Sequence, residues 1–261
     1  MQLPMFQIDA FTDKMFSGNP AAVCPLENWL PDDVMQKIAM ENSVAETAFF
    51  IPLNDGFEIR WFTPEIEMDL CGHATLATAH VIFRHLNSQL SSLKFYSKSG
   101  ILNVTVENEL LTLDFPSRRP EPSDVPQIIL DAIQVEPIDA LKSRDYILVF
   151  KTEEIVRNMN PNQGILNQIN LDPGGIAVTA RGDEVDFVSR FFTSQASIFE
   201  DPVTGSAHCS LIPYWSQKLE KKSMCALQLS SRVGKLNCKD LGERVLISGK
   251  AVTYLEGRIS I

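Results

Sequence analysis

One short segment of the chain places a cysteine, a glycine and a histidine directly before an apolar stretch. It reads "MDLCGHATLATAHVIF", from Met68 to Phe83, and contains Cys71, Gly72 and His73. The residues that follow are apolar on too many faces for a surface helix, so we predict a buried helix over 72–86. Reactive groups would then lie at the first turn of a helix surrounded by sheet.

A second segment repeats this arrangement with different side chains. It reads "FEDPVTGSAHCSLIPYW", from Phe199 to Trp215, and places Asp201 four residues before Gly205, which Ser206 follows. The apolar pattern predicts a helix over 205–219. Pro213 lies inside this helix, where it removes one backbone hydrogen bond and is expected to cause a kink.

The N-terminus of a helix carries unpaired backbone N–H groups and about half a positive charge, so it attracts carboxylates and developing oxyanions. Gly72 and Gly205 would let a ligand approach the backbone closely. His73 and Ser206 would add polar side chains at the first turn. We therefore expect the two helix starts to bind a small carboxylic acid without a lysine.

Glu46 is the main candidate for proton transfer. It lies just before the hydrophobic run from Ala48 to Ile51, which we expect to form a strand. Partial burial at this position disfavours the charged carboxylate and makes the group usable as an acid or a base. Asp201 or His73 would complete a proton relay. The alternatives are that Glu46 is a solvated charge at a strand edge and that His73 only begins a helix.

Other kinds of site find less support. Cys71 and His73 are too sparse for a metal centre because no further cluster of ligands follows them, so we expect no metal and no cofactor. Phosphate-binding loops and the G-x-S-x-G motif are absent. A racemase with two thiols also lacks support, since the residue 130 positions after Cys71 is Asp201.

The chain repeats itself at half its length. The segment Phe57–Ala74 is echoed by Phe187–Ala207, and the words Arg-aromatic-Phe-Thr begin at Arg60 and Arg190, an offset of 130. A weaker match pairs residues 101–115 with residues 243–261. Two copies of one unit explain these similarities.

The repeat predicts an α+β fold of two pseudo-symmetric domains, each a mixed β-sheet closed around a central α-helix. The Pro-rich segment from Phe115 to Gln127 cannot continue a helix or a central strand. We therefore place the domains at 1–118 and 119–261, leaving open that the last strand crosses back to the first half. Related halves usually bind a ligand where they meet.

The overall composition is that of a soluble globular protein, which we expect in the cytoplasm. The chain has 261 residues, of which 44% are hydrophobic, and a net charge of −10. Its acidity disfavours nucleic acid as a partner, no apolar run is long enough for a membrane span, and no signal peptide is recognised. Five widely spaced cysteines without a C-x-x-C pair are expected to be reduced.

Four segments resemble the PhzF-like family, the phenazine-biosynthesis isomerases that share a fold with diaminopimelate epimerase. They occur in the family's order and are spaced along most of the chain: "DAFTDKMFSGNPAAV" (9–23), "AETAFF" (45–50), "RWFTPEIEMDLCGHATLA" (60–77) and "FEDPVTGSAHCSLIPYW" (199–215).

The resemblance implies that Glu46 shuttles a proton without metal or organic cofactor. It also implies that His73, Asp201 and Ser206 accompany Glu46, with Gly72 and Gly205 at the helix starts. Asn19, in the Gly-Asn-Pro turn, matches a further family position, and we expect it to contribute to substrate binding. A homodimer is the expected assembly.

The expected function is a cofactor-independent isomerase that moves a proton within a small cyclic or unsaturated carboxylic acid, in the cleft between the domains. Two departures from the family concern the substrate: Ala45 replaces a serine that is common before the glutamate, and Cys71 replaces a non-thiol residue. One alternative is an amino-acid or hydroxy-acid epimerase that uses Cys71. The other is a ligand-binding or interaction protein of the same fold without catalysis.

Overall fold

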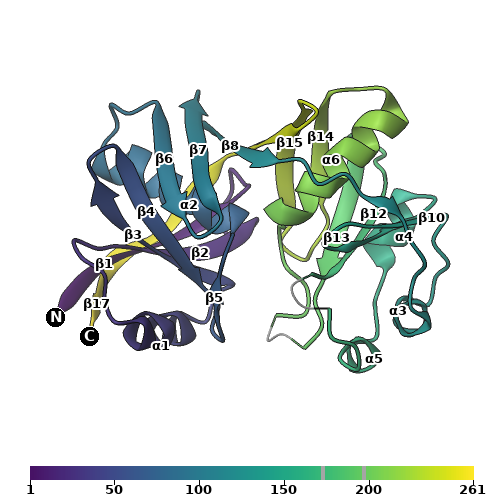
Figure 1. Cartoon of the computed structure of the whole chain (residues 1–261), viewed down its shortest axis with the longest axis horizontal. Helices are drawn as coiled ribbons and strands as arrows, with labels where there is room; N and C mark the ends of the chain where they lie inside the picture. The colour runs from purple at the N-terminus through teal and green to yellow at the C-terminus, as the bar shows by residue number, and fades with distance from the viewer. Residues whose placement is uncertain (172–173, 196–197) are drawn as a thin grey trace. The chain divides into compact units, whose positions relative to one another are not determined.

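The computed structural model describes residues 1–171, 174–195 and 198–261 (Figure 1). Strands dominate, and helices are few, which confirms the α+β class. The strands are β1 (Gln2–Ala10), β2 (Asn19–Pro25), β3 (Glu46–Leu53), β4 (Gly56–Phe62), β5 (Glu67–Met68), β6 (Ser92–Ser97), β7 (Gly100–Glu107), β8 (Leu110–Pro116), β9 (Glu121–Pro122), β10 (Asp139–Lys142), β11 (Tyr146–Val149), β12 (Ile176–Arg181), β13 (Phe187–Phe192), β14 (Ser223–Gln228), β15 (Gly234–Asp240), β16 (Arg244–Gly249) and β17 (Ala251–Ser260). The helices are α1 (Asp32–Asn42), α2 (Gly72–Val81), the π-helix η1 (Ile82–Leu86), α3 (Gln127–Ile133), α4 (Glu153–Asn158), α5 (Gln163–Leu166) and α6 (Gly205–Leu219).

The chain divides into two compact units. Unit 1 contains residues 1–115 and 247–261, and unit 2 contains residues 116–246. The change at Pro116 lies three residues before the boundary drawn near Arg119 from the sequence. The last strand, β17, runs antiparallel to β1 along its whole length, so the end of the described chain belongs to unit 1.

Both units have the same order of strand pairing. In unit 1, β1–β2, β3–β4 and β6–β7 pair antiparallel, whereas β2–β3 and β4–β6 pair parallel. In unit 2 the same alternation runs through β10–β11, β11–β12, β12–β13, β13–β14 and β14–β15. This repeated order supports the internal duplication.

The weaker sequence match between residues 101–115 and 243–261 was wrong by one strand. Residues 101–115 form β7 and β8, whereas residues 243–261 form β16 and β17. The counterpart of β7 and β8 in the strand order is β15 and β16. Strand β17 instead matches β9, because each follows the last strand of its copy and pairs antiparallel with the first strand of the other copy.

A buried helix lies at the centre of each unit, as predicted. Every residue of α2 except His80 is buried, and the helix packs against β1, β2 and β3 (Figure 1). The predicted helix over 72–86 is confirmed, although its last turn is the π-helix η1. Helix α6 has the predicted bounds and contains Pro213.

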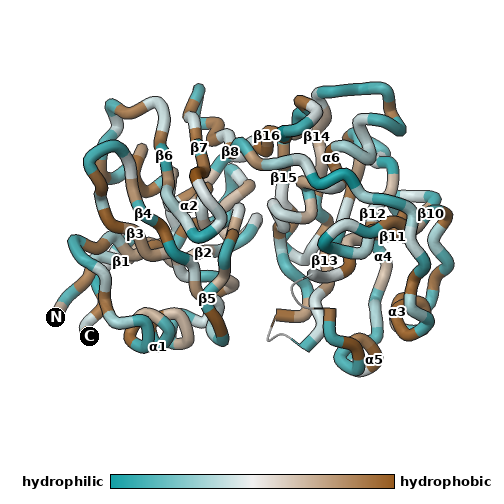
Figure 2. The backbone as a smooth tube through the Cα atoms, in the orientation of Figure 1, coloured by the Kyte–Doolittle hydropathy of each residue, from teal (hydrophilic) through white to brown (hydrophobic). Residues whose placement is uncertain are grey.

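Apolar side chains from strands and helices form the core of each unit. In unit 1, Phe49 of β3 packs edge to face against Phe62 of β4, and Met35 of α1 joins the same cluster. In unit 2, Leu148, Val178 and other strand residues pack against α3, α4 and α5. Figure 2 shows the hydrophobic stretch along β3. Among the described residues, no helix is long and apolar enough to cross a membrane.

The turn between β1 and β2 explains most of the segment 9–23. Gly18 has a φ of +66°, and a Cβ added there would lie 2.1 Å from the carbonyl oxygen of Ala10. Only glycine fits such a position. The buried carboxylate of Asp9 accepts a hydrogen bond from the backbone N–H of Phe16 at 2.8 Å. These contacts hold the turn that leads into β2, whose first residue is Asn19.

Candidate active site

The site in unit 1 is built on Glu46 and His73. Glu46 begins β3, and His73 is the second residue of α2. The Oε2 atom of Glu46 lies 3.0 Å from Nε2 of His73, with side chains that are 16% and 4% exposed. Neither of these two buried atoms makes a well-aligned hydrogen bond. A buried polar atom without a hydrogen bond lowers the stability of the fold, and such atoms are often retained where they have a catalytic role.

The other ring nitrogen of His73 has two neighbours. The side-chain nitrogen of Asn19 lies 3.1 Å from Nδ1, and Sγ of Cys71 lies 3.6 Å from it. Asn19 is fully buried, and Cys71 is the residue directly before α2. Asn19, Cys71, His73 and Glu46 thus form one connected polar cluster inside an apolar unit.

Burial and charge act in opposite directions on this cluster. Burial lowers the pKa of the His73 imidazole, but the neighbouring Cys71 and Glu46 outweigh it, so the pKa lies well above its ordinary value. Burial, assisted by the charge of Glu46, raises the pKa of the Cys71 thiol. The raised pKa opposes a thiolate at Cys71, whereas Cys71 and Glu46 both favour a protonated His73 ring.

Glu46, Cys71 and His73 could also offer ligands to a metal ion. One possible ligand atom from each lies within 4.8 Å of the others. A thiolate, an imidazole and a carboxylate are a donor set that Zn²⁺ accepts. The sequence interpretation counted only Cys71 and His73 and missed Glu46. Binding would require loss of the Cys71 proton, which burial opposes.

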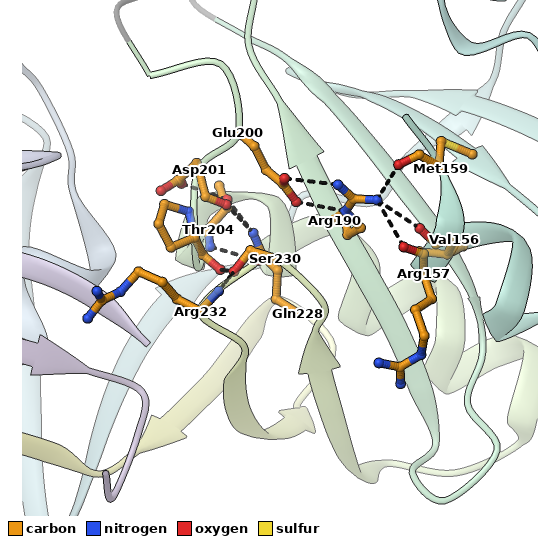
Figure 3. A network of polar contacts seen from close by, with 11 residues as sticks. Val156, Arg157, Met159, Arg190, Glu200, Asp201, Thr204, Gln228, Ser230 and Arg232 are labelled. Atoms are coloured by element: carbon orange, nitrogen blue, oxygen red, sulfur yellow. Dashed lines mark hydrogen bonds and ion pairs between the residues drawn. The ribbon is translucent and has the colours of Figure 1, made fainter. Parts of the chain in front are cut away.

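The site in unit 2 is built on Asp201 and Thr204, just before α6 (Figure 3). The hydroxyl of Thr204 donates a hydrogen bond of 2.6 Å to Oδ2 of Asp201. Gln228 of β14 donates from Nε2 to the backbone oxygen of Asp201 and to the hydroxyl of Thr204, and its Oε1 accepts from the backbone N–H of Thr204. Asp201 is therefore held at the start of α6 by a buried amide.

Ser206 lies in the first turn of α6 beside an arginine that the sequence analysis missed. Nη2 of Arg144 donates a hydrogen bond of 2.9 Å to the Ser206 hydroxyl and lies 3.2 Å from Asp145. Burial raises the pKa of Asp145, although Arg144 acts against it. Arg144 adds positive charge to a helix N-terminus that already favours anions. It lies between β10 and β11, where no local motif marks it.

The repeated Arg-aromatic-Phe-Thr words position the loops that lead to both helices. Arg60 makes a two-pronged ion pair with Glu67, at 2.7 and 2.9 Å. Arg190 makes the same pair with Glu200 at the same two distances and also donates to the backbone oxygens of residues 156, 157 and 159 (Figure 3). The Arg-aromatic-Phe-Thr motif is therefore repeated because its arginine makes the same loop contact in both units. The echoed segment includes residues 196–197, which lie outside the described residues.

The offset of 130 between the copies does not extend to the helices. The loop before α6 is longer than the loop before α2, and the helices begin at Gly72 and Gly205, an offset of 133. The counterpart of Cys71 is therefore Thr204 and not Asp201. Because residue 204 is a threonine, unit 2 has no thiol at the position that corresponds to Cys71.

The predicted site residues fall into two groups, one in each unit. The structure brings Asn19, Glu46 and His73 together, with Gly72 at the start of α2. It places Asp201, Gly205 and Ser206 together at the start of α6. Their roles in catalysis and substrate binding stay predictions.

Three other histidines have structural partners. His80 and His85 both contact the hydroxyl of Thr253 in β17. His208 is fully buried, contacts the backbone oxygen of Thr204 through Nδ1, and has a pKa lowered to about 4 by burial. All five cysteines are free thiols, as predicted.

Comparison with known proteins first defines the class of fold. A PhzF family protein from Enterococcus faecalis superposes with a TM-score of 0.95 at 45% identity and covers 100% of both chains. A hydroxyproline epimerase from Agrobacterium vitis superposes with a TM-score of 0.64 at 7% identity over 100% of this chain and 93% of its own, and so shares the fold alone. The predicted epimerase-like fold is confirmed.

The family model described as phenazine biosynthesis-like protein, PhzC-PhzF, matches residues 8–257, and the chain belongs to this family. An uncharacterized isomerase from Pseudomonas aeruginosa is 47% identical over 100% of both chains. A phenazine biosynthesis-like domain-containing protein from Homo sapiens is 37% identical, again over 100% of both. Together these findings confirm the family resemblance and the prediction of an enzyme of the isomerase class.

Proposed function

We propose that the protein is a cofactor-independent isomerase that moves a proton between carbon atoms of a small cyclic or unsaturated carboxylic acid. Glu46 takes the proton from one carbon and returns it to another. His73 holds Glu46 in place and assists the movement of its proton. Asp201 orients the substrate, and Asn19, Gly72, Gly205 and Ser206 are further predicted contacts to it.

The contact between Glu46 and His73 is the observation that carries this proposal. A general base must be partly shielded from water and must have a partner that stabilises its charge. Glu46 meets both conditions, since its side chain is 16% exposed and its Oε2 lies 3.0 Å from the imidazole. Such positioned acid–base catalysis contributes about 10²- to 10⁴-fold to a rate.

The start of α6 supports the assignment of a carboxylic acid as substrate. Helix N–H groups, the Ser206 hydroxyl and the Arg144 guanidinium gather there, and all three favour an anion. Arg144 is thereby a further candidate for substrate binding. Its loss should raise the KM of an accepted acid more than it lowers kcat.

An epimerase that uses Cys71 is the second candidate, favoured by the 3.6 Å contact between Sγ and His73. The raised pKa of Cys71 argues against a ready thiolate base. A binding protein without turnover is the third. Cytoplasmic location, a homodimeric state and the absence of nucleic-acid or membrane partners stay predictions.

The test is a screen of carboxylic acids with the intact protein in heavy water, read by mass spectrometry. We expect deuterium to enter a carbon position of an accepted acid and the Glu46→Gln variant to lose at least 100-fold of this rate. Glu107→Gln is the matched control, because Glu107 is exposed at the end of β7 and is distant in sequence from the candidate residues. Undiminished exchange in Glu46→Gln would remove the assignment.

The same screen separates the alternatives. Cys71→Ala should stop an epimerase that depends on the thiol and should affect the Glu46 isomerase much less. A pure binding protein would bind an acid in the screen, detected by a thermal shift, without any entry of deuterium.

A further inference from the structure

We propose that Asn19 is a positioning residue that determines which ring nitrogen of His73 carries the proton. In the neutral ring the proton lies on Nε2, the nitrogen that is 3.0 Å from Oε2 of Glu46. The catalytic meaning of this arrangement rests on the proposed function, but the position of the proton can be measured without any substrate.

The argument begins with Glu46, because an ionised carboxylate can only accept hydrogen bonds. Its Oε2 lies 3.0 Å from Nε2 of His73. A lone pair on Nε2 would lie close to the negative oxygen and be repelled by it. The proton of the neutral imidazole is therefore expected on Nε2, and Nδ1 is left with a lone pair.

Asn19 meets this requirement at the opposite side of the ring. Its side-chain nitrogen lies 3.1 Å from Nδ1, and an amide NH₂ group can only donate. A donor at Nδ1 and an acceptor at Nε2 demand the same tautomer. With the amide nitrogen of Asn19 at Nδ1, the contacts at both ring nitrogens favour the same neutral tautomer.

The backbone keeps Asn19 in position for this contact. Asn19 is the first residue of β2, is paired with Ala10 of β1, and is fully buried. The preceding Gly18 makes the tight turn that brings β2 back along β1. Water has little access to Nδ1, since His73 is only 3% exposed. The Asn19 amide must therefore supply the hydrogen bond to Nδ1 that water supplies to an exposed histidine.

Among the described residues, three polar side chains contact the ring of His73, and two of them lie at Nδ1. Glu46 comes from β3 and accepts at Nε2. Cys71 precedes α2, and its thiol is a weak donor 3.6 Å from Nδ1. Asn19 comes from β2 and is the stronger donor of the two at Nδ1. Removal of the Cys71 thiol should leave the tautomer unchanged.

The same amide also suits the protonated ring. When Nδ1 gains a proton, a half-turn of the Asn19 side chain presents its carbonyl oxygen to the new N–H. An aspartate at position 19 could only accept. The substitution Asn19→Asp would therefore favour a proton on Nδ1 in every state and oppose the neutral Nε2–H form.

The test is nitrogen NMR of the protein labelled with ¹⁵N-histidine, recorded through the titration of His73. The signal is assigned by its loss in His73→Gln, and His80, His85 and His208 serve as internal references. We expect the neutral form of the unaltered protein to show a protonated Nε2 and an unprotonated Nδ1. A neutral ring protonated on Nδ1 would overturn the proposal with no need for a variant.

The variants sharpen this result. Asn19→Asp should keep the second proton on His73 at a pH where the unaltered ring is neutral, whereas Cys71→Ala should show the unaltered tautomer. An unchanged spectrum in Asn19→Asp, or a reversed tautomer in Cys71→Ala, would contradict the role of Asn19.

Activity gives a separate readout. If an exchanging acid is found, Asn19→Asp should slow its exchange about 10- to 100-fold, the factor expected when one hydrogen bond to a charged group is misdirected, and should shift the pH profile. If no acid exchanges, the proposed function fails, while the NMR result still decides the tautomer.

Discussion

The substitution Thr204→Val tests whether the network at the start of α6 holds that part of unit 2 together. Valine keeps the shape of threonine and removes only the hydroxyl, which donates at 2.6 Å to Asp201 and accepts from Gln228. Thr204 is 5% exposed, so water cannot readily replace these partners. Its side chain makes no capping bond to the helix, and the loss is therefore confined to the network.

The expected cost follows from these two contacts. A hydrogen bond to a charged group is worth about 1.5–3 kcal/mol, and Gln228 keeps its second acceptor, the backbone oxygen of Asp201. We therefore expect a loss of about 2 kcal/mol in the free energy of unfolding. For a chain of this size such a loss lowers Tm by about 4–8 °C.

Urea unfolding followed by fluorescence and by circular dichroism measures this loss. Thr204→Ser is the matched control, because it keeps the hydroxyl and should lie within about 1 kcal/mol of the unaltered protein. If Thr204→Val unfolds at the same urea concentration as Thr204→Ser, the network contributes no stability and the reasoning is refuted.

Three further predictions concern single residues. Gly18→Ala should cost about 2 kcal/mol or more in urea unfolding, since its Cβ would meet the Ala10 carbonyl oxygen, whereas Gly100→Ala, with open space around it, should cost less; equal losses would contradict this. Burial lowers the pKa of His208 to about 4, whereas the pKa of an unfolded histidine is about 6.5. Below about pH 6.5 the unfolded chain binds a proton that the folded chain does not, so the free energy of unfolding should fall by on the order of 3 kcal/mol as the pH drops toward 4. His208→Gln should weaken this pH dependence of urea unfolding, and an unchanged slope would show that other groups cause it. A maleimide reagent should label Cys225 first in mass spectrometry, because the other four thiols are buried, and early labelling of a buried thiol would argue against the packing.

Much of the fold could be predicted because its signals are local. Apolar residues on every face of 72–86 and 205–219 predicted two buried helices, and the continuous hydrophobic run after Glu46 predicted β3. The weaker repeat failed because short amphipathic strands resemble one another, so that β16 and β17 matched β7 and β8 as well as the true counterparts would.

The candidate site could be predicted only in part. Glu46 and His73 stood out by their positions beside a strand and a helix, whereas their contact depends on how β3 and α2 pack. Arg144 and Gln228 come from segments with no motif, and only the folded chain brings them to the start of α6. The role of Asn19 beside His73 likewise depends on pairing between β1 and β2.

The pairing of β17 with β1 has a consequence for biosynthesis. A ribosome makes the first residues of unit 1 long before the strand that completes its sheet, and all of unit 2 is synthesised in between. The edge of β1 that β17 covers would therefore stay unpaired, and open to chaperones, until β17 has also been made.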